Sequence, residues 1–275
     1  MTARTILITG CSSGIGLASV RAMKARGWRV IATARREDDL AMLRADFKVD
    51  AVHLELADPE SVTQCVNRAL ALCTGRIDAL FNNAAYGQAG AVEDLSVGLL
   101  RRQFEVNLFA QHEIIRRLVP GMRAQGYGRI VQCSSVLGLV AAPLRGAYCA
   151  SKFAMEGLTD SMRIELAGSG IHIALIEPGP IRTRFVENAL ANFLSTIDIQ
   201  GSVHRVAYEA RVERMKLGRN ETFKLEPDAV AAKLVHAVES ARPKKRYYVT
   251  KPTYFAAALK RVAPQGTIDW FVQKM

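Results

Sequence analysis

The sequence predicts one α/β domain with a doubly wound parallel sheet, and three observations support that fold class. Short apolar runs rich in β-branched residues alternate with longer stretches of helical period along residues 5–177. Such alternation requires crossover helices, which pack on both faces of a parallel sheet. No linker, repeat or low-complexity tract divides residues 1 to about 180. With 49% hydrophobic and 23% charged residues, the chain of 275 residues can bury the core that this fold needs.

Each apolar run is expected to form one strand, with a helix after it. The predicted strands cover 5–9, 28–34, 51–56, 79–82, 129–134 and 172–177. The predicted helices begin near Gly14, Asp38, Pro59, Ser96 and Ala147. A later helix begins at Pro227, because proline in the first turn with Asp228 beside it is a helix-start signal, and a last strand covers 246–250.

The segment 182–226 has weak periodicity and little turn chemistry, which favours a mobile lid over a substrate pocket. Ordinary core packing is the alternative for its apolar residues, which are Phe185, Val186, Leu190, Phe193 and Leu194. We therefore expect one domain over 1–253 and a C-terminal extension over 254–275. Phe255 and Trp270 of that extension lie among basic residues, so it could contact a membrane surface peripherally or pack on a partner subunit.

Composition excludes several classes of protein. No run reaches the roughly 18 apolar residues of a membrane-spanning helix, and the N-terminus turns into glycine before a signal-peptide core could form. The five cysteines are odd in number and contain no C-x-x-C pair, which argues against a disulfide framework and a zinc site. We therefore expect a cytoplasmic protein without a metal.

The net charge is +11, from 37 basic and 26 acidic residues, and it favours anionic partners. Nucleic acid, a lipid surface and a phosphorylated small molecule all fit that charge. The basic stretch 242–261 is most simply a solvated face. Because no nucleic-acid recognition motif is present, we expect a small-molecule substrate and no nucleic acid.

A glycine-rich turn follows the first predicted strand in T-G-C-S-S-G-I-G. Gly10 permits a tight turn, and Gly14 and Gly16 let backbone N–H groups approach a pyrophosphate at the positive end of a helix. The spacing differs from the common G-x-G-x-x-G fingerprint of Rossmann folds, although the position after the first strand is the same. The residues predicted to bind a cofactor here are Gly10, Ser12, Ser13, Gly14, Ile15 and Gly16.

The same turn also matches the G-x-S-x-G nucleophile elbow of serine hydrolases, with Ser12 as nucleophile. An elbow needs an oxyanion N–H from an earlier loop, and only one strand precedes this turn. His236 is a candidate base, but nothing in the sequence marks it as one. We therefore favour phosphate binding.

The second strand ends in A-T-A-R-R, where an acid would bind the ribose 2′-hydroxyl of NAD. Arg35 stands there instead, and a guanidinium can hold a 2′-phosphate with two hydrogen bonds. The sequence therefore favours NADP over NAD, with NAD as the alternative cofactor.

Tyr148 and Lys152 form a Y-x-x-x-K pair at the start of a predicted helix. Four residues rise about 6 Å along a helix and return to the same face, so the ammonium can lie near the phenol and lower its pKa for proton transfer. Tyr247 and Lys251 have the same spacing on a predicted strand, where four residues span about 13 Å and the effect is weaker.

Three polar residues complete the candidate site. Ser135 ends the strand R-I-V-Q-C-S-S, and ligands of open α/β sheets bind beyond the carboxyl ends of strands. Asn83 follows the fourth strand and Asn107 lies in a predicted helix, so both are polar residues in apolar surroundings. For each asparagine alone, a structural hydrogen bond is the alternative to a role in the site.

Together, T-G-C-S-S-G-I-G, N-N-A-A, Asn107, Ser135, Y-C-A-S-K and E-P-G-P-I-R-T resemble the short-chain dehydrogenase/reductase family over roughly residues 4–185. These motifs most resemble those of the subgroup that contains the estradiol 17β-dehydrogenases and retinol dehydrogenases. Two residues depart from the family pattern: Ala85 stands where a glycine is usual, and Glu55 where an aspartate often contacts adenine.

The resemblance implies a role for each matching residue. Tyr148 would exchange the substrate proton, Lys152 would bind the nicotinamide ribose, and Ser135 would hold the substrate oxygen. Asn107 would anchor a water beside Lys152, Asn83 would contact the cofactor, and Thr183 would bind near the nicotinamide or the diphosphate.

The expected function is hydride transfer between NADP(H) and a lipophilic secondary alcohol or ketone, such as a steroid, retinoid or fatty derivative, by a homo-oligomer. An NADPH-sensing protein without turnover is the alternative.

Overall fold

The computed structural model describes residues 3–216 and 223–273, and its centre is a seven-stranded parallel sheet. The strand order is β3-β2-β1-β4-β5-β6-β7, so the chain winds outward from β1 in both directions. This confirms the predicted single α/β domain with a doubly wound sheet. The strands are β1 (Thr5–Ile8), β2 (Arg29–Ala34), β3 (Asp50–His53), β4 (Ala79–Asn82), β5 (Gly128–Cys133), β6 (Ile171–Glu177) and β7 (Arg246–Tyr248).

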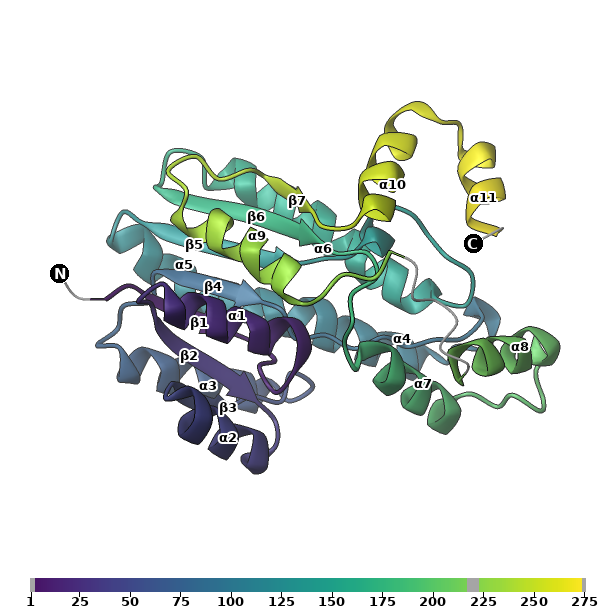
Figure 1. Cartoon of the computed structure of the whole chain (residues 1–275), viewed down its shortest axis with the longest axis horizontal. Helices are drawn as coiled ribbons and strands as arrows, with labels where there is room; N and C mark the ends of the chain where they lie inside the picture. The colour runs from purple at the N-terminus through teal and green to yellow at the C-terminus, as the bar shows by residue number, and fades with distance from the viewer. Residues whose placement is uncertain (1–2, 217–222, 274–275) are drawn as a thin grey trace.

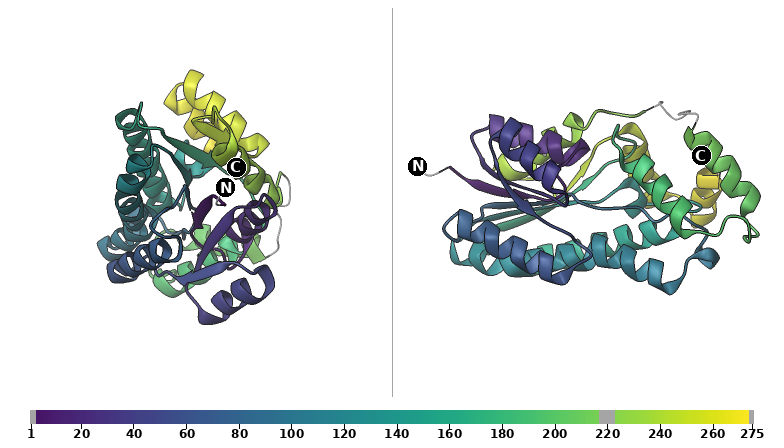
Figure 2. Two further views of the ribbon diagram at one scale, coloured as in Figure 1. Left: turned by 90° about the vertical axis from the view of Figure 1, so that its left-hand side faces the viewer. Right: turned by 90° about the horizontal axis from the view of Figure 1, so that it is seen from below.

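Helices cover both faces of the sheet, as Figure 2 shows. One face carries α1 (Gly14–Ala25), α2 (Glu37–Phe47) and α9 (Asp228–Glu239), and the other carries α3 (Pro59–Leu72), α5 (Ala110–Ala124) and α6 (Gly146–Glu165), with α4 (Val97–Phe104) packed on α6. Each face buries its own apolar cluster, which is the arrangement that fixes a sheet between two helical layers.

Local capping chemistry sets several helix starts where the sequence predicts them. The Asp58 carboxylate accepts a hydrogen bond from the Glu60 backbone N–H at 3.0 Å, with Pro59 in the first turn of α3. Ser96 caps α4 by accepting from the Leu99 N–H at 3.3 Å. All six helices predicted from sequence begin within one residue of the predicted start.

The segment 182–226, predicted as a mobile lid, contains helices that the sequence did not predict. These are α7 (Phe185–Thr196) and α8 (Arg205–Lys216), while 217–222 lie outside the described residues. Phe193 and Tyr208 are buried in a small, separate hydrophobic cluster with Ala91. α8 is mostly polar and its one fully buried aromatic packs on this local cluster, so α8 lacks the broad apolar stripe of a core helix.

The C-terminal extension forms α10 (Lys251–Val262) and α11 (Gln265–Gln273). Figure 1 shows these two helices and the α7–α8 pair at the same end of the molecule, beyond the carboxyl ends of the strands. None of the described helices is both long and apolar enough to cross a membrane.

Candidate active site

A cavity of about 2190 Å³ lies at the carboxyl ends of the strands. Its wall is formed by the β1–α1 turn, the ends of β2, β4 and β5, the start of α6, and helices α7, α8, α10 and α11. This is the end of an open α/β sheet where ligands bind. Of the predicted site residues, the wall includes Gly10, Ser12, Ser13, Gly14, Ile15, Arg35, Asn83, Ser135, Tyr148, Lys152 and Thr183.

The glycines of the β1–α1 turn have different tasks. Gly10 has φ +73°, and a Cβ there would lie 2.9 Å from Ala84, so only glycine fits comfortably. Gly14 has φ +55° and faces the Thr183 methyl group. Gly16 is not on the cavity wall, because it packs directly against the Gly10 backbone. The assignment of Gly16 to the cofactor site stays a prediction, and its packing against Gly10 holds the turn in shape.

A hydrogen-bonded clamp joins the ends of β1 and β4 under the cavity. The Asn83 side-chain amide donates to the carbonyl of Thr9 at 2.9 Å and to that of Gly10 at 3.2 Å. In return, the Thr9 hydroxyl accepts from the backbone N–H groups of Asn83 and Ala84, both at 2.9 Å. Asn83 therefore lines the cavity and fixes the glycine turn at the same time.

Arg35 lies at the end of β2, on the cavity wall, with 71% of its side chain exposed. Its nearest acid is Glu55, whose carboxylate lies 3.6 Å from the guanidinium. Glu55 itself accepts a hydrogen bond from the Ala57 N–H at 2.9 Å, which orients it along this rim of the cavity. The neighbouring Arg36 is outside the wall and pairs with Asp38 at 3.1 Å.

The structure brings Ser135, Tyr148 and Lys152 together. Ser135 lies two residues after β5 and caps a short 3-10 turn, accepting from the Leu137 N–H at 3.1 Å, and its hydroxyl hydrogen-bonds with Tyr148. Lys152 is 1% exposed, and its ammonium lies 5.8 Å from the centre of the Tyr148 ring. The same ammonium donates to the Cys133 carbonyl at 2.6 Å, which holds it against the end of β5.

Burial dominates the acidity of this group of residues. It raises the pKa of the Tyr148 phenol, while the hydrogen bond from Ser135 and the charge of Arg145 act in the opposite direction. Burial also lowers the pKa of Lys152 to about 8, because a charged ammonium is disfavoured away from water. The expectation that the neighbouring lysine gives Tyr148 a lowered pKa is therefore wrong for these protein groups: desolvation of the phenol is the larger effect.

Asn107 lies behind this group rather than on the cavity wall. It sits in a π-helical turn (Glu105–Phe109) between α4 and α5, a feature frequent at functional sites. Its amide group donates to the Tyr86 carbonyl at 3.0 Å and to the Ser151 hydroxyl at 3.2 Å, and accepts from the Tyr86 N–H at 3.1 Å. Asn107 thus ties the loop after β4 to the residue that precedes Lys152.

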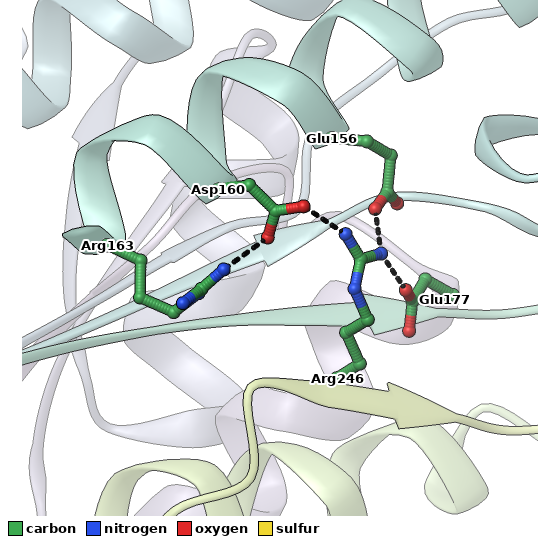
Figure 3. Close-up of polar contacts among 5 residues, drawn as sticks. All are labelled: Glu156, Asp160, Arg163, Glu177 and Arg246. Carbon is green, nitrogen blue, oxygen red and sulfur yellow. Dashed lines mark hydrogen bonds and ion pairs between the residues drawn. The ribbon is translucent and has the colours of Figure 1, made fainter.

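A buried charged network lies along the helix face that begins with Lys152. Figure 3 shows Arg246 of β7 between Glu156 and Asp160 of α6 and Glu177 of β6. The guanidinium is 2.6 Å from Asp160 and 2.7 Å from Glu177, and it also pairs with Glu156. Burial raises the pKa of Glu177 to about 8, and the neighbouring Glu156 charge adds to that effect. The network therefore attaches the last strand to the helix that carries Tyr148 and Lys152.

Removing the cation of this network should destabilise the fold in a pH-dependent way. We expect Arg246→Met to lower the free energy of unfolding by about 3–5 kcal/mol, because two buried carboxyls lose their partner. Glu177 binds protons more tightly in the folded than in the unfolded chain, so stability falls as pH rises from about 4.5 to about 8, and more steeply in the variant. Urea denaturation at pH about 5 and about 8.5 measures both effects.

The matched control is Arg163→Met, which removes the 2.8 Å contact with Asp160 alone, at a half-exposed site. Its expected cost is at most about 1 kcal/mol. Equal losses in the two variants would contradict a special role for Arg246.

The structure does not support the serine hydrolase alternative. His236 lies on α9 and is not on the cavity wall, and its Nδ1 is hydrogen-bonded to the Tyr247 hydroxyl at 2.8 Å. Tyr247 also accepts from the Lys244 N–H at 2.9 Å, so this tyrosine is used in packing. Ser12 and His236 are therefore not a catalytic pair.

The sequence did not single out several residues of the cavity. Arg145 precedes Tyr148 by three residues, and its charge acts on the phenol; the i, i+3 spacing on the helix was an available signal. Phe185, which the sequence offered as a lid or a core residue, packs its ring 5.5 Å from the Tyr148 ring. Arg211 of α8 reaches the wall only through the tertiary fold, so no local pattern marks it.

The metal-ligating side chains and the cysteines complete the description of the site. Within residues 3–216 and 223–273, no three His, Cys, Asp or Glu side chains lie together so that they could hold a metal ion. All five cysteines are buried and unpaired.

Comparison with known proteins extends over nearly the whole chain. The profile of the family described as short chain dehydrogenase matches residues 4–192. The chain is 40% identical to "Uncharacterized oxidoreductase YbbO" of Escherichia coli, over 98% of this chain and 94% of that protein. It is 32% identical to retinol dehydrogenase 8 of Bos taurus, over 96% and 87%, and 32% identical to human 17-beta-hydroxysteroid dehydrogenase type 1, over 91% and 79%.

Solved structures agree in fold and were determined with nicotinamide dinucleotides. A short-chain dehydrogenase/reductase from Burkholderia phymatum in complex with NAD aligns with a TM-score of 0.79 at 25% identity, over 94% of this chain and 92% of that one. An actinorhodin polyketide ketoreductase with NADPH aligns with a TM-score of 0.74 at 25% identity, over 90% and 95%. The family predicted from the motifs is confirmed: this chain belongs to the short-chain dehydrogenases, a family of oxidoreductases, with retinol and steroid dehydrogenases among its relatives.

Proposed function

We propose that the protein transfers a hydride between NADP(H) and a lipophilic secondary alcohol or ketone. The observation that carries the proposal is the meeting of Ser135, Tyr148 and Lys152 on one cavity wall beside the glycine turn. The bound dinucleotide supplies the hydride. Ser135 holds the carbonyl or hydroxyl oxygen of the substrate, and Tyr148 gives or takes its proton.

Lys152 and Asn107 support that proton transfer. With a pKa near 8, Lys152 is largely charged at neutral pH, and an ammonium 5.8 Å from the phenol ring stabilises a phenolate once the proton has left. In this proposal the ammonium also binds the nicotinamide ribose. Asn107, which is hydrogen-bonded to Ser151, anchors the water that connects Lys152 to solvent.

The protein residues fit a dinucleotide. The first turn of α1 contains no acid, so its N-terminal dipole is free to favour a pyrophosphate, and a Cβ at Gly10 would fill the turn where that group belongs. Thr183 lies beside Gly14 and is placed for the diphosphate or the carboxamide. Arg35 at the end of β2 favours NADP, because a guanidinium binds a 2′-phosphate and a carboxylate would repel it.

Reversing the charge at this rim should change the cofactor preference. We expect Arg35→Asp to lower the NADPH:NADH ratio of kcat/KM by about 10–100-fold, since it removes a charged hydrogen bond and adds repulsion. Arg36→Asp is the matched control, because Arg36 is exposed, paired with Asp38 and outside the wall. Initial rates with each cofactor measure the ratio; an equal shift in both variants would exclude a specific contact with Arg35.

The substrate is lipophilic in this proposal because the far side of the cavity is largely apolar. Its walls there include Phe185 and Val186 of α7, Phe255 and Leu259 of α10, and Phe271 of α11. The names of two relatives, retinol dehydrogenase 8 and 17-beta-hydroxysteroid dehydrogenase type 1, refer to large apolar alcohols. Residues of the segment 182–226 and of the C-terminal extension thus both line the substrate end of the cavity.

Loss of NADPH absorbance with a panel of ketones and aldehydes, run in parallel with NADH, tests the proposal. Turnover of lipophilic carbonyl compounds is the expected result. Tight NADPH binding without turnover of any compound would favour the sensing protein instead. We further propose a cytoplasmic homo-oligomer; size-exclusion chromatography with light scattering would contradict this by giving the mass of a monomer.

A further inference from the structure

Basic residues outnumber acidic residues along the cavity wall as a whole. Among the described residues of the wall, nine are Lys or Arg and only two are acidic, Glu55 and Glu93. Glu55 faces Arg35, and Glu93 is hydrogen-bonded to His204. Neither acid neutralises the arginines that lie between Tyr148 and α8.

Arg145 is the first of these arginines. It precedes the first turn of α6, is partly buried, and lies on the cavity wall. Burial lowers its pKa, and the groups that act in the opposite direction are Tyr148 and Cys149 rather than a carboxylate. Within residues 3–216 and 223–273, its guanidinium has neither a hydrogen bond nor an ion pair.

Arg211 of α8 is the second. One of its N–H groups donates weakly to the Pro143 carbonyl at 3.5 Å, and its Nε is buried with no hydrogen-bond partner in the described part of the chain. Burial lowers its pKa to about 10, and repulsion from Arg145 and Arg214 adds to the effect. Arg145 and Arg211 are thus partly buried guanidiniums of like charge on one cavity wall, and an anion between them would relieve their repulsion.

The position of Arg211 is fixed by the packing of α8. Tyr208, one turn earlier, is fully buried, and its hydroxyl donates to the Asp94 carboxylate at 2.5 Å while accepting from the Ala91 N–H at 2.7 Å. Its ring also packs 5.0 Å from that of Phe193 in α7. Arg211 is thus presented to the cavity by an anchored helix, as a preorganised ligand contact requires.

We propose that Arg145 and Arg211 bind an anionic end group of the substrate, so that the preferred substrate is an apolar aldehyde, ketone or alcohol that also carries a carboxylate or a phosphate monoester. The planar guanidinium matches either group with paired hydrogen bonds. The apolar walls of α7, α10 and α11 then take the hydrocarbon part. This inference rests on the proposed function, because Tyr148 must reach the carbonyl while the anion reaches Arg211.

Calorimetric titration of the full-length protein in the presence of NADP tests the binding step without turnover. The probes are octanoate, octyl phosphate and uncharged methyl octanoate, and the variants are Arg211→Gln and Arg205→Gln. Arg205 is the matched control, since it lies on the same helix, pairs with Glu209 at 2.8 Å and is outside the wall. We expect at least one anion to bind about tenfold or more tightly than the ester, and Arg211→Gln alone to remove that advantage.

The two anionic probes identify the source of the charge: the tighter of them names a carboxylate or a phosphate end group. Anion binding that is insensitive to Arg211→Gln would overturn the proposal, because the anion would then occupy another site. Equal binding of the ester and both anions would overturn it as well.

Turnover of an oxo acid and its methyl ester separates this inference from the proposed function. We expect Arg211→Gln to lower kcat/KM about tenfold for the acid, mainly through KM, and to leave the ester within about twofold. Reduction of neutral ketones with no preference for acids would overturn the anion site alone. Arg211-dependent binding of octanoate without reduction of any carbonyl compound would overturn the proposed function alone.

Discussion

Tyr148→Phe should lower kcat by about 10²–10⁴-fold while changing cofactor affinity little. The substitution removes one hydroxyl from the cavity wall and leaves the ring packed 5.5 Å from Phe185. The loss follows from proton transfer: without the phenol, Ser135 can still polarise the substrate oxygen, but no group of matching geometry gives or takes its proton. Steady-state rates with NADPH and a ketone found active in the panel measure kcat, and fluorescence titration of NADPH measures cofactor affinity.

Tyr247→Phe provides a matched control for this experiment. Tyr247 is also a buried tyrosine with a lysine four residues later, but its hydroxyl is bonded to His236 and Lys244 and is not on the cavity wall. We expect unchanged kcat and a loss of stability of about 1–3 kcal/mol for the two lost hydrogen bonds. A Tyr148→Phe variant with kcat within tenfold of the unmodified protein would contradict the assignment of Tyr148.

Gly16→Ala should weaken cofactor binding even though Gly16 is not on the cavity wall. A Cβ at this position would overlap the Gly10 carbonyl oxygen and lie 2.9 Å from the Asn83 side-chain amide. Because these neighbours are backbone and a clamping side chain, the glycine turn must shift. An overpacked site of this kind costs about 1–3 kcal/mol, equivalent to about 10–100-fold in NADPH affinity if the strain falls on the turn.

NADPH titration and thermal unfolding of the same variant separate lost affinity from lost stability. Gly157→Ala is the control, because Gly157 lies on an exposed position of α6 with nothing within 4 Å of its added Cβ. That variant should bind NADPH normally and be stabilised by up to about 1 kcal/mol. Normal NADPH affinity in Gly16→Ala would show that the turn tolerates the added methyl group.

The sequence predicted those strands, helix starts and turns that are determined by a few consecutive residues. The period-2 apolar runs, the proline-led helix starts and the glycines after the first strand each depend on a few consecutive residues. The Tyr148–Lys152 spacing likewise needed only the geometry of one helix. For this reason the doubly wound parallel sheet agrees with the prediction, and the predicted residues of the glycine turn other than Gly16 lie on the cavity wall.

The features that the sequence did not predict depend on contacts between segments that are distant along the chain. The pKa of Tyr148 rises because Phe185 and the walls around it remove water, and no spacing rule measures that desolvation. Arg211 reaches the cavity only because Tyr208 anchors α8 over Asp94. The helices within 182–226 were missed because their apolar residues serve a small cluster of their own instead of the main core.

The cavity has walls of two origins, and this arrangement has an evolutionary consequence. The glycine turn, Ser135, Tyr148 and Lys152 come from the alternating first part of the chain, whereas much of the substrate end comes from helices after residue 184. Mutations in the later helices can therefore alter which molecules the cavity accepts without touching the glycine turn, Ser135, Tyr148 or Lys152. Duplicated genes can then diverge in the molecules that their products accept while they keep the same reaction. A chimaera joined near residue 184 would exchange that selectivity together with the later helices.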